Sequence, residues 1–358
     1  MKITIINSKG HWKNGWVSSE TDLQSLIASL ERSNCIVDTF EVNSVASLEN
    51  LLQDIDPSTL ILPNAYYVDQ QEGSEETVWM VDIIEAHNLP FIGSDSRTLQ
   101  NVLQKDVCQA ILQQHQVPIP VFTTLTPADF GNEHSILEAS ALTYPAIIKL
   151  TAESGSMGID DTSIVHNQQE AVVQIQKMLQ QYQQNVIVEE FLASNDITIS
   201  YLQDPNGEAK LLTTWYLVAN KPGVNSVLGH KERFMLWGGV KQMAEVKDEK
   251  ILRQVEAIVP KVCHILNIKD ITRIDGRLDQ QGQLRIFDVN GFPALCFPES
   301  VGVHQIISCF PEYEPADLFD ALINSMVLSA ANRYQIPVPK KIQQHNFFTL
   351  NTMKRVTV

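Results

Sequence analysis

Short apolar runs alternate with helix-like segments through the first hundred residues, and this alternation limits the possible folds more than any other feature. Strand-like runs lie at 3–6, 36–40, 60–62 and 90–92, and helical patterns lie between them at 21–31, 48–52 and 76–87. Such repetition is typical of a mostly parallel, doubly wound sheet. Ligands bind these sheets beyond the carboxyl ends of the strands, so the loop 7–16 is a candidate binding loop.

Two common nucleotide-binding motifs do not occur in the sequence. Neither G-x-G-x-x-G nor G-x-x-x-x-G-K-[ST] is found anywhere along the chain. Both motifs use glycines to bring the backbone close to phosphates. Their absence disfavours a dinucleotide-binding fold and a P-loop ATPase.

Charge and cysteine usage exclude other classes. The chain holds 26 Lys plus Arg against 42 Asp plus Glu, a formal net charge of −16, which disfavours nucleic acid as a partner. The five cysteines form no C-x-x-C pair, so we expect reduced thiols rather than zinc or disulfides. No apolar run reaches the roughly 20 residues that span a bilayer, and residues 1–7 are too short for a signal peptide. We therefore expect a cytoplasmic protein without membrane contact.

The 358 residues are too many for one core, so several lobes are expected. We place the boundaries at 1–103, 104–192, 193–345 and a tail at 346–358. The second lobe combines strands at 144–150, 164–166 and 186–190 with helices at 105–116 and 168–181. The third has strands at 197–202, 210–216, 271–278 and 284–289 and a helix at 248–266.

The sharpest chemical signal is a predicted hairpin that carries Arg273 and Asp275 on one strand and Asp288 and Asn290 on the other. Side chains two residues apart share one face of a strand. A turn closing symmetrically around 281–282, with Gly282 at positive φ, places Asp275 opposite Asp288. The same register places Arg273 opposite Asn290.

Two carboxylates facing each other repel, and a divalent cation between them reverses that effect. Together with an amide oxygen, Asp275 and Asp288 form an oxygen ligand set that suits Mg²⁺. Apolar neighbours such as Ile274 and Val289 favour partial burial. The alternative is a surface hairpin with solvated acids.

Two further segments carry weaker signals. Lys149 ends an apolar strand and is followed by a loop with Gly155 and Gly158, where a lysine and backbone N–H groups could meet phosphate oxygens. The strand 186–190 ends in two acids and precedes Asp196, which could accept from ribose hydroxyls. The alternatives are an ordinary glycine turn and a strand that ends at an acidic surface.

In this order, the three segments resemble the ATP-grasp family, and within it the D-alanine–D-alanine ligases. The resemblance runs from about residue 75 to 310 and includes the segment 89–94. It implies an ATP-grasp fold of the mixed α/β (α+β) class, preceded by the doubly wound parallel-sheet domain. It also implies a homodimer.

The resemblance assigns the nucleotide site residue by residue. Contacts to ATP phosphates fall to Lys105 and Lys149. The mobile glycine-rich loop over the phosphates comprises Ser154, Gly155, Ser156 and Gly158. The adenosine contacts are Glu189, Glu190, Phe191, Leu192 and Asp196.

The resemblance also assigns the metal and catalytic residues. Asp275, Asp288 and Asn290 match the ligands of Mg²⁺ (two ions, or Mn²⁺ in their place), with Asp288 where the family usually has Glu. Arg273 matches the arginine that steadies the tetrahedral intermediate. Lys231 matches the lysine near the transferred phosphate.

The acceptor end departs from the family. Glu20 stands for the amine-binding glutamate and Ser300 for a substrate-carboxylate contact, but Ala294 replaces a usual glycine. Trp12 and Trp16 in the first loop either wall the amino-acid pocket or pack beneath a surface loop. We therefore expect an amino-acid or peptide substrate larger than D-alanine.

The sequence thus predicts an ATP- and Mg²⁺-dependent carboxylate–amine ligase that forms an amide bond through an acyl phosphate. One alternative is an ATP-grasp enzyme of natural-product biosynthesis that loads an amino acid onto another amine or a carrier. The other is a non-catalytic nucleotide-binding regulator. A mere binder has no need of Arg273, which favours the ligase.

Overall fold

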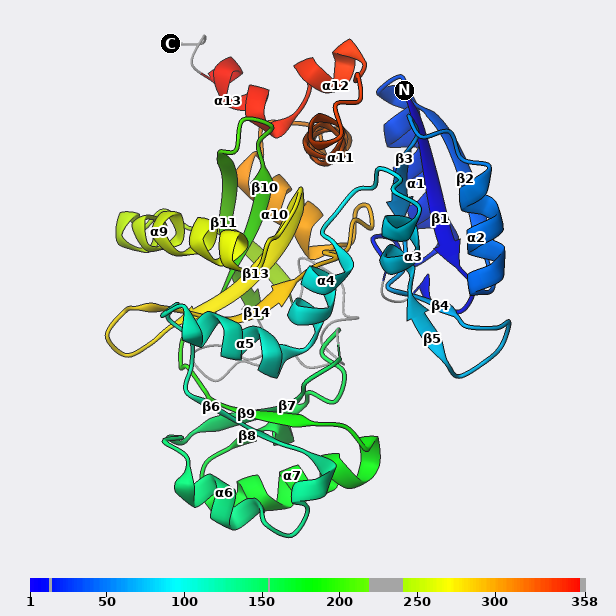
Figure 1. The fold of residues 1–358 in the computed structure, drawn as a ribbon. Coiled ribbons are helices and arrows are strands. Elements are labelled where there is room, and N and C mark those ends of the chain that lie inside the picture. The colour runs from blue at the N-terminus through cyan, green and yellow to red at the C-terminus, as the bar shows by residue number, and fades with distance from the viewer. Residues whose placement is uncertain (13–14, 154, 219–240, 355–358) are drawn as a thin grey trace.

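The computed structural model describes residues 1–12, 15–153, 155–218 and 241–354. Three larger sheets and one short hairpin make up the β-structure of this part of the chain. Figure 1 shows the N-terminal sheet beside the five-stranded sheet, with the four-stranded sheet at the opposite end of the molecule from α11. The fold is therefore of the mixed helix-and-sheet kind that the sequence predicts.

A parallel three-stranded sheet, with strand order β2-β1-β3, forms the N-terminal region. Its elements are β1 (Lys2–Ser8), α1 (Glu20–Arg32), β2 (Ile36–Val42), α2 (Val45–Gln53), β3 (Leu60–Pro63) and α3 (Met80–Ala86). The Ser19 hydroxyl begins α1 by accepting from the Asp22 amide at 3.2 Å. The predicted strand–helix alternation is confirmed here.

Two segments of this region differ from their predicted structure. Residues 76–87 begin as a strand, because β5 (Thr77–Trp79) pairs with β4 (Tyr67–Asp69) and the helix starts only at Met80. Pairing with β4 suits the β-branched Thr77 and Val78 and overrides the helical periodicity. The predicted strand at 90–92 is reduced to one parallel bridge between Phe91 and Ile61.

The order β2-β1-β3 creates a switch point at the carboxyl ends of β1 and β3, where open sheets bind ligands. Asn64, directly after β3, is fully buried there. Its amide oxygen accepts from the Val17 amide at 2.9 Å, and its amide nitrogen donates to Asn7 Oδ1 at 2.8 Å. These bonds fix the end of the first loop, so the start of α1 has a defined position.

The central region is a four-stranded antiparallel sheet with order β6-β9-β7-β8. Its strands are β6 (Phe122–Leu125), β7 (Ala146–Leu150), β8 (Ile164–Val165) and β9 (Val186–Glu190), and its helices are α6 (Glu133–Ala139) and α7 (Gln168–Tyr182). The two helices cover one face (Figure 1), where Ile148 and Leu150 pack against Ile175. Alternation therefore directs Ile147 and Lys149 to the other face.

The five-stranded antiparallel sheet has the order β12-β11-β10-β13-β14. Its strands are β10 (Asp196–Gln203), β11 (Ala209–Val218), β12 (Lys241–Glu245), β13 (Ile271–Leu278) and β14 (Leu284–Asn290). On one face, Ile274 and Ile286 pack in a core with Val255 of α9 (Glu249–Ile265). The other face carries the polar residues of β13. Two short helices, α4 (Ser96–Leu103) and α5 (Lys105–Gln114), lie between the N-terminal and central sheets in the sequence.

Helices near the end of the chain pack into the same hydrophobic core as the first strand. Four further helices follow β14: α10 (Val301–Cys309), α11 (Pro315–Arg333), α12 (Lys340–Gln344) and α13 (Phe347–Lys354). Phe319 of α11 and the fully buried Phe347 of α13 belong to the same apolar cluster as Ile3 and Ile5 of β1. Residues 346–350, at the start of the expected tail, are therefore packed into the protein.

A buried carboxylate ties three regions together. Asp270 is 1% exposed and accepts from the Gly93 amide at 2.7 Å, the Ser329 hydroxyl at 2.9 Å and Arg333 Nη2 at 3.0 Å. Burial raises the pKa of this carboxyl, and Arg333 and the hydrogen bonds oppose that rise. The group links the segment before α4, the strand β13 and the helix α11.

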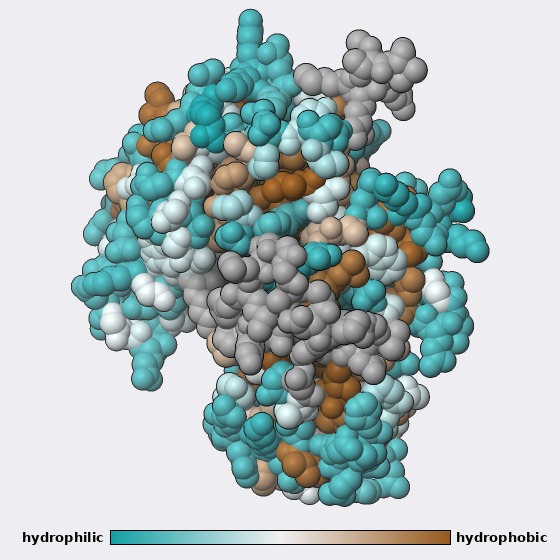
Figure 2. All heavy atoms as spheres, turned by 180° about the vertical axis from the view of Figure 1, so that it is seen from behind, coloured by the Kyte–Doolittle hydropathy of each residue, from teal (hydrophilic) through white to brown (hydrophobic). Residues whose placement is uncertain are grey.

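The visible surface is mostly hydrophilic. Hydrophilic residues cover most of the face seen in Figure 2, and apolar residues gather there in small patches. Among the helices that the structure describes, none is long and apolar enough to cross a lipid bilayer.

Candidate active site

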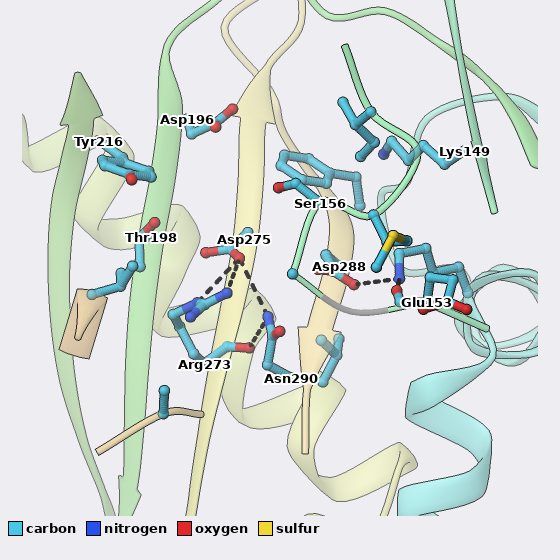
Figure 3. A pocket seen from close by; sticks show the side chains of 18 of the residues that line it. Lys149, Glu153, Ser156, Asp196, Thr198, Tyr216, Arg273, Asp275, Asp288 and Asn290 are labelled. Atoms are coloured by element: carbon cyan, nitrogen blue, oxygen red, sulfur yellow. Dashed lines mark hydrogen bonds and ion pairs between the residues drawn. The ribbon is translucent and has the colours of Figure 1, made fainter. Parts of the chain in front are cut away.

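A cavity of about 490 Å³ collects the residues that the sequence singled out. The four-stranded sheet contributes β7 and β9, the five-stranded sheet contributes β10, β13 and β14, and the start of α1 closes one end. Fourteen predicted site residues line it: Lys105, Lys149, Gly155, Ser156, Glu189, Glu190, Phe191, Leu192, Asp196, Arg273, Asp275, Asp288, Asn290 and Ser300. Figure 3 draws the side chains of 18 of its lining residues and labels ten of them, which come from separate strands and loops.

The predicted register of the hairpin is confirmed. Asp275 pairs with Asp288 and Arg273 pairs with Asn290 across β13 and β14. Gly282 has the positive φ, 76°, that the turn requires. All four polar side chains therefore share one face and line the cavity.

The route to that register includes a β-bulge that the sequence did not reveal. Near the turn the pairing is Gly276 with Ile286 and Leu278 with Leu284, one residue out of phase with the predicted symmetry. The register shifts between Asp275 and Gly276, which leaves Phe287 as an extra residue in β14. Without the bulge, continued pairing would set Phe287 opposite Asp275.

Arg273 closes one side of the carboxylate pair. Its Nε and Nη2 donate to Asp275 Oδ2 at 3.2 and 3.1 Å, and Asn290 Nδ2 donates to the same oxygen at 3.3 Å (Figure 3). Burial raises the pKa of the Asp275 carboxyl, Arg273 lowers it, and the neighbouring Asp288 raises it further. A cation at this position would favour the ionised carboxylate.

The donor set fits a hard divalent cation. Asp275 Oδ1 is buried and has no hydrogen-bond partner among the described residues, so one ligand position is open. Within the described part of the chain, no three His, Cys, Asp or Glu side chains converge as a metal cluster. Two carboxylates and one amide oxygen nevertheless suit Mg²⁺, which takes its remaining ligands from water and phosphates. The Asn290 amide presents its nitrogen to Asp275 and would have to rotate to offer its oxygen.

Two lysines reach the cavity beside the carboxylates. Lys105 Nζ donates to the Glu153 carbonyl at 2.5 Å and lies 3.9 Å from Asp288 Oδ1. Lys149 is 7% exposed, forms an ion pair with Glu189, and lies 4.7 Å from the centroid of the Phe287 ring. Glu189 Oε1 is buried without a hydrogen-bond partner among the described residues. These groups form a polar cluster on the cavity side of the four-stranded sheet.

Only part of the predicted glycine-rich loop lines the cavity. Gly155 and Ser156 do so, with φ values of 68° and 58°. Gly158 does not; its α-carbon faces Leu150 and Met178, where an added Cβ would lie 3.2 Å from a Leu150 methyl group. Ser154 lies outside the described residues, as does Lys231 in the predicted catalytic pair.

The predicted adenosine residues lie together, but with a partner that the sequence analysis missed. Asp196 forms an ion pair with Arg277, whose Nη1 also donates to the Leu192 carbonyl at 3.0 Å. Arg277 stands two residues after Asp275, so the alternation of β13 could have found it. Lys241 at the start of β12 and Tyr216 of β11 also line the cavity without having been predicted.

At the predicted acceptor end, the structure does not bring Glu20 to the cavity. Glu20 is exposed and accepts from Gln24 Nε2 at 2.8 Å within α1. Ser18 and Asp22 line the cavity instead, on either side of the N-cap. Ser300 lines it as predicted and caps α10, where its hydroxyl accepts from the Val303 amide at 3.4 Å.

The two tryptophans are set back from the cavity. Trp16 is fully buried and stacks on Phe292 at 4.7 Å, and Phe292 stacks on Tyr66 at 4.6 Å. Of these three rings only Tyr66 lines the cavity. Trp12 is half-buried and donates to Glu41 Oε2 at 3.2 Å. Of the two alternatives, packing beneath the loop is therefore the one observed.

Comparison with known proteins gives the same family that the sequence resembles. The family model described as D-ala D-ala ligase C-terminus matches residues 111–301, more than half of the chain. A D-alanine–D-alanine ligase from Aquifex aeolicus is 25% identical over 213 residues. That match covers 60% of this chain and 66% of the relative, just under two thirds of its length.

Solved structures share the fold over nearly the whole chain. The D-alanine–D-alanine ligase from Bacillus anthracis, solved in complex with ATP, matches with a TM-score of 0.65 at 15% identity and covers 94% of this chain and 99% of its own. The D-Ala:D-Ser ligase from Enterococcus faecalis matches with a TM-score of 0.62 at 16% identity and covers 91% and 99%. At these identities the likeness concerns the fold, and it confirms the predicted fold class.

Proposed function

Because the chain belongs to the family described as the D-ala D-ala ligase C-terminus, we propose that it is an ATP- and Mg²⁺-dependent ligase that joins a carboxylate to an amine. The observation that carries the proposal is the paired hairpin face of Arg273, Asp275, Asp288 and Asn290 inside the cavity. A binding module would gain little from a buried arginine among carboxylates.

The first step would be phosphoryl transfer from ATP to the substrate carboxylate. A carboxylate oxygen bonds to the γ-phosphorus, the bond to the β-phosphate oxygen breaks, and ADP leaves with an acyl phosphate formed. Such transfer is catalysed mainly by positioning and by positive charge around the phosphate oxygens. Lys105 and Lys149 line the cavity and would supply part of that charge. Asp275, Asp288 and Asn290 would hold Mg²⁺, which would supply the rest.

The second step would form the amide. The amine nitrogen attacks the acyl carbon and negative charge collects on the carbonyl oxygen. The carbonyl then re-forms as the bond to the phosphate oxygen breaks, and inorganic phosphate leaves with the proton that the amine gives up. Arg273, 9% exposed and held in place by Asp275, could stabilise that oxyanion. We assign residues 1–103 to an N-terminal α/β domain, 104–192 to a central ATP-grasp subdomain and 193–345 to a C-terminal ATP-grasp subdomain that carries the metal and substrate site.

The test is a screen of amino-acid and dipeptide pairs with ATP and Mg²⁺. We expect phosphate release that depends on both substrates, and a product whose mass equals their sum less one water. Arg273→Met should lose the product while retaining ADP binding. ADP binding without any amide product, unchanged in that variant, would favour the non-catalytic regulator.

ATP with Mg²⁺ should raise the melting temperature of the protein. A ligand that binds only the folded state stabilises it by about 2.7 kcal/mol at a hundredfold excess over its dissociation constant. Lys149→Ala should erase most of that gain, because it removes a charged contact to phosphate. The measurement is the difference in melting temperature with and without nucleotide in each variant, so the loss of the Lys149–Glu189 pair cancels.

Lys177→Ala is the matched control. Lys177 is exposed on α7, which covers the opposite face of the same sheet. It should give the same nucleotide-induced shift as the parent protein. Equal shifts in both variants and the parent would place the nucleotide elsewhere.

Asp22→Asn should raise the KM for the acceptor amino acid about tenfold, with the KM for ATP unchanged. The reason is that Asp22, not Glu20, lines the acceptor end, where a carboxylate can bind an ammonium group. A higher KM for one substrate alone points to its own pocket. Glu20→Gln, two residues away on the same helix, should leave both KM values unchanged. A higher KM for the acceptor in Glu20→Gln but not in Asp22→Asn would make Glu20 the amine-binding residue.

A further inference from the structure

Arg277 is a buried cation in the cavity wall to which the proposed chemistry gives no role. It continues the row of Arg273 and Asp275 along one face of β13, and all three line the cavity. Arg277 is 6% exposed, so its charge is largely removed from water. A buried charge is costly unless its partners are well placed, so those partners indicate its task.

The guanidinium group contacts three residues of one short segment, Phe191, Leu192 and Asp196. Its Nε donates to Asp196 Oδ1, its Nη1 donates to the Leu192 carbonyl at 3.0 Å, and its plane lies over the Phe191 ring, 4.7 Å from the centroid. The register of β10 and β13, which pairs Ile197 with Gly276, continues to place Asp196 across from Arg277. The ion pair is thus a cross-strand pair at the start of β10.

The segment 191–195 joins the two sheets that enclose the cavity. At its start, Glu190 and Phe191 amides donate to the carbonyls of Val121 and Pro145 at 2.8 and 2.9 Å, on the side of the four-stranded sheet. Toward its end, the Ser194 hydroxyl accepts from the Leu278 amide of β13 at 2.8 Å. Arg277 is the charged side chain that binds this connection from the five-stranded sheet.

We propose that Arg277 is a positioning residue for the nucleoside end of the cavity. By occupying Asp196 Oδ1 it aims the second carboxylate oxygen at the cavity, where it can accept from a ribose hydroxyl. By holding the Leu192 carbonyl and the Phe191 ring it fixes the backbone beside the base. Arg277 itself touches no nucleotide atom; it acts through Asp196 and the connection 191–195. This role rests on the proposed function only in that the cavity binds a nucleotide.

The chemistry of the pair predicts a specific defect. A hydrogen bond to a carboxylate contributes more binding free energy than one between two neutral groups. It does so when donor and acceptor are kept in good geometry. Arg277→Met fills similar space but leaves Asp196 free to turn. Loss of ribose recognition should therefore follow, whereas a purely structural residue would lower stability without changing the preference between nucleotides.

The experiment measures binding of ADP, 2′-deoxy-ADP and 3′-deoxy-ADP with Mg²⁺ by calorimetry, in the full chain. The parent protein should prefer ADP over at least one deoxy analogue about tenfold or more. Arg277→Met should weaken ADP binding about tenfold and reduce the preference to less than threefold, and Asp196→Asn should reduce the preference to the same extent. In its preference for ADP over the deoxy analogues, the double variant should be no worse than Asp196→Asn alone, because the two residues act on the ribose as one unit.

Two further variants keep the inference falsifiable. Arg277→Lys keeps the positive charge but loses the planar set of N–H donors. It should recover part of the affinity for ADP even where Arg277→Met folds poorly. Arg285→Met removes a neighbouring Arg–Asp pair, with Asp279, that does not line the cavity, and should change nothing in nucleotide preference. Full ribose preference in Arg277→Met or Arg277→Lys, or additive effects of Arg277→Met and Asp196→Asn, would overturn the proposal.

The outcome is separable from that of the proposed ligase activity. Ribose-selective ADP binding that depends on Arg277, in a protein that forms no amide, would refute the ligase and retain this role. Amide formation in a protein whose ribose preference does not depend on Arg277 would support the ligase and refute this role of Arg277. Where turnover is found, Arg277→Met should raise the KM for ATP while kcat stays within about threefold.

Discussion

Replacing Asp288 by asparagine should reduce turnover by roughly a hundredfold to a thousandfold, the usual cost of removing one electrostatic stabiliser of a transition state. Asp288 faces Asp275 across the hairpin, and both carboxylates are proposed ligands of Mg²⁺. The neutral amide keeps the shape of the side chain but not its charge. It should therefore weaken Mg²⁺-dependent ADP binding as well.

The fold should tolerate this change. Like charges directly opposite each other across strands destabilise a sheet, so Asp288→Asn removes a repulsion in the metal-free protein. Lys105, 3.9 Å away, offsets part of that repulsion, so the melting temperature without Mg²⁺ should be equal or slightly higher. Asp38→Asn is the control, because Asp38 forms an exposed ion pair with Lys2 on the N-terminal sheet. Retained turnover in Asp288→Asn would refute the metal assignment.

Trp16→Ala should lower the free energy of unfolding by about 3–5 kcal/mol, the range measured for large aromatic side chains removed from cores. Trp16 is fully buried, stacks on Phe292 at an interplanar angle of 29°, and packs against Gly93, where an added Cβ would lie 3.3 Å from its ring. Urea denaturation of the parent and variant measures the difference. The melting shift produced by ATP should persist in the folded variant.

Two further substitutions should lower the free energy of unfolding by less than Trp16→Ala does. Trp16→Phe keeps a ring and removes Nε1, which has no hydrogen-bond partner among the described residues, so it should cost less than Trp16→Ala. Trp12→Ala should cost about 1 kcal/mol, because Trp12 is only half-buried. A loss below about 1 kcal/mol for Trp16→Ala would contradict its place in the core. A changed acceptor preference without loss of stability would restore the pocket-wall hypothesis.

The pairing of Asp275 with Asp288 is predictable from the sequence, but the way the hairpin turns is not. Symmetric closure about residues 281–282 would pair the whole hairpin in one register, whereas the pairing near the turn is shifted by one residue. The bulge at Phe287 restores the phase at Asp275. A sequence pattern records which residues alternate, but a bulge depends on how the two strands fit, and Phe287 gave no local signal for it.

The helix start at the acceptor end shows a different limit. Ser18, Glu20 and Asp22 follow one another at intervals of two residues, and only the angular position around the start of α1 decides which of these side chains face the cavity. That position depends on Ser19 as the N-cap and on Asn64, which is distant in the sequence. In contrast, Arg277 was within reach, since alternation alone places it on the face of Arg273 and Asp275.

The shared core of the first and last regions has a consequence for synthesis of the protein. Ile5 of β1 packs in one cluster with Phe319 and Phe347, and Asp270 binds both Gly93 and Arg333. While the ribosome is still producing the middle of the chain, the N-terminal sheet has emerged but the helices that bury part of its surface have not. Domains usually fold in order as they emerge, and exposed apolar surface invites aggregation during the wait. Newly made chains should therefore depend on chaperones until residues 315–350 have been added, and truncation before α11 should yield insoluble protein.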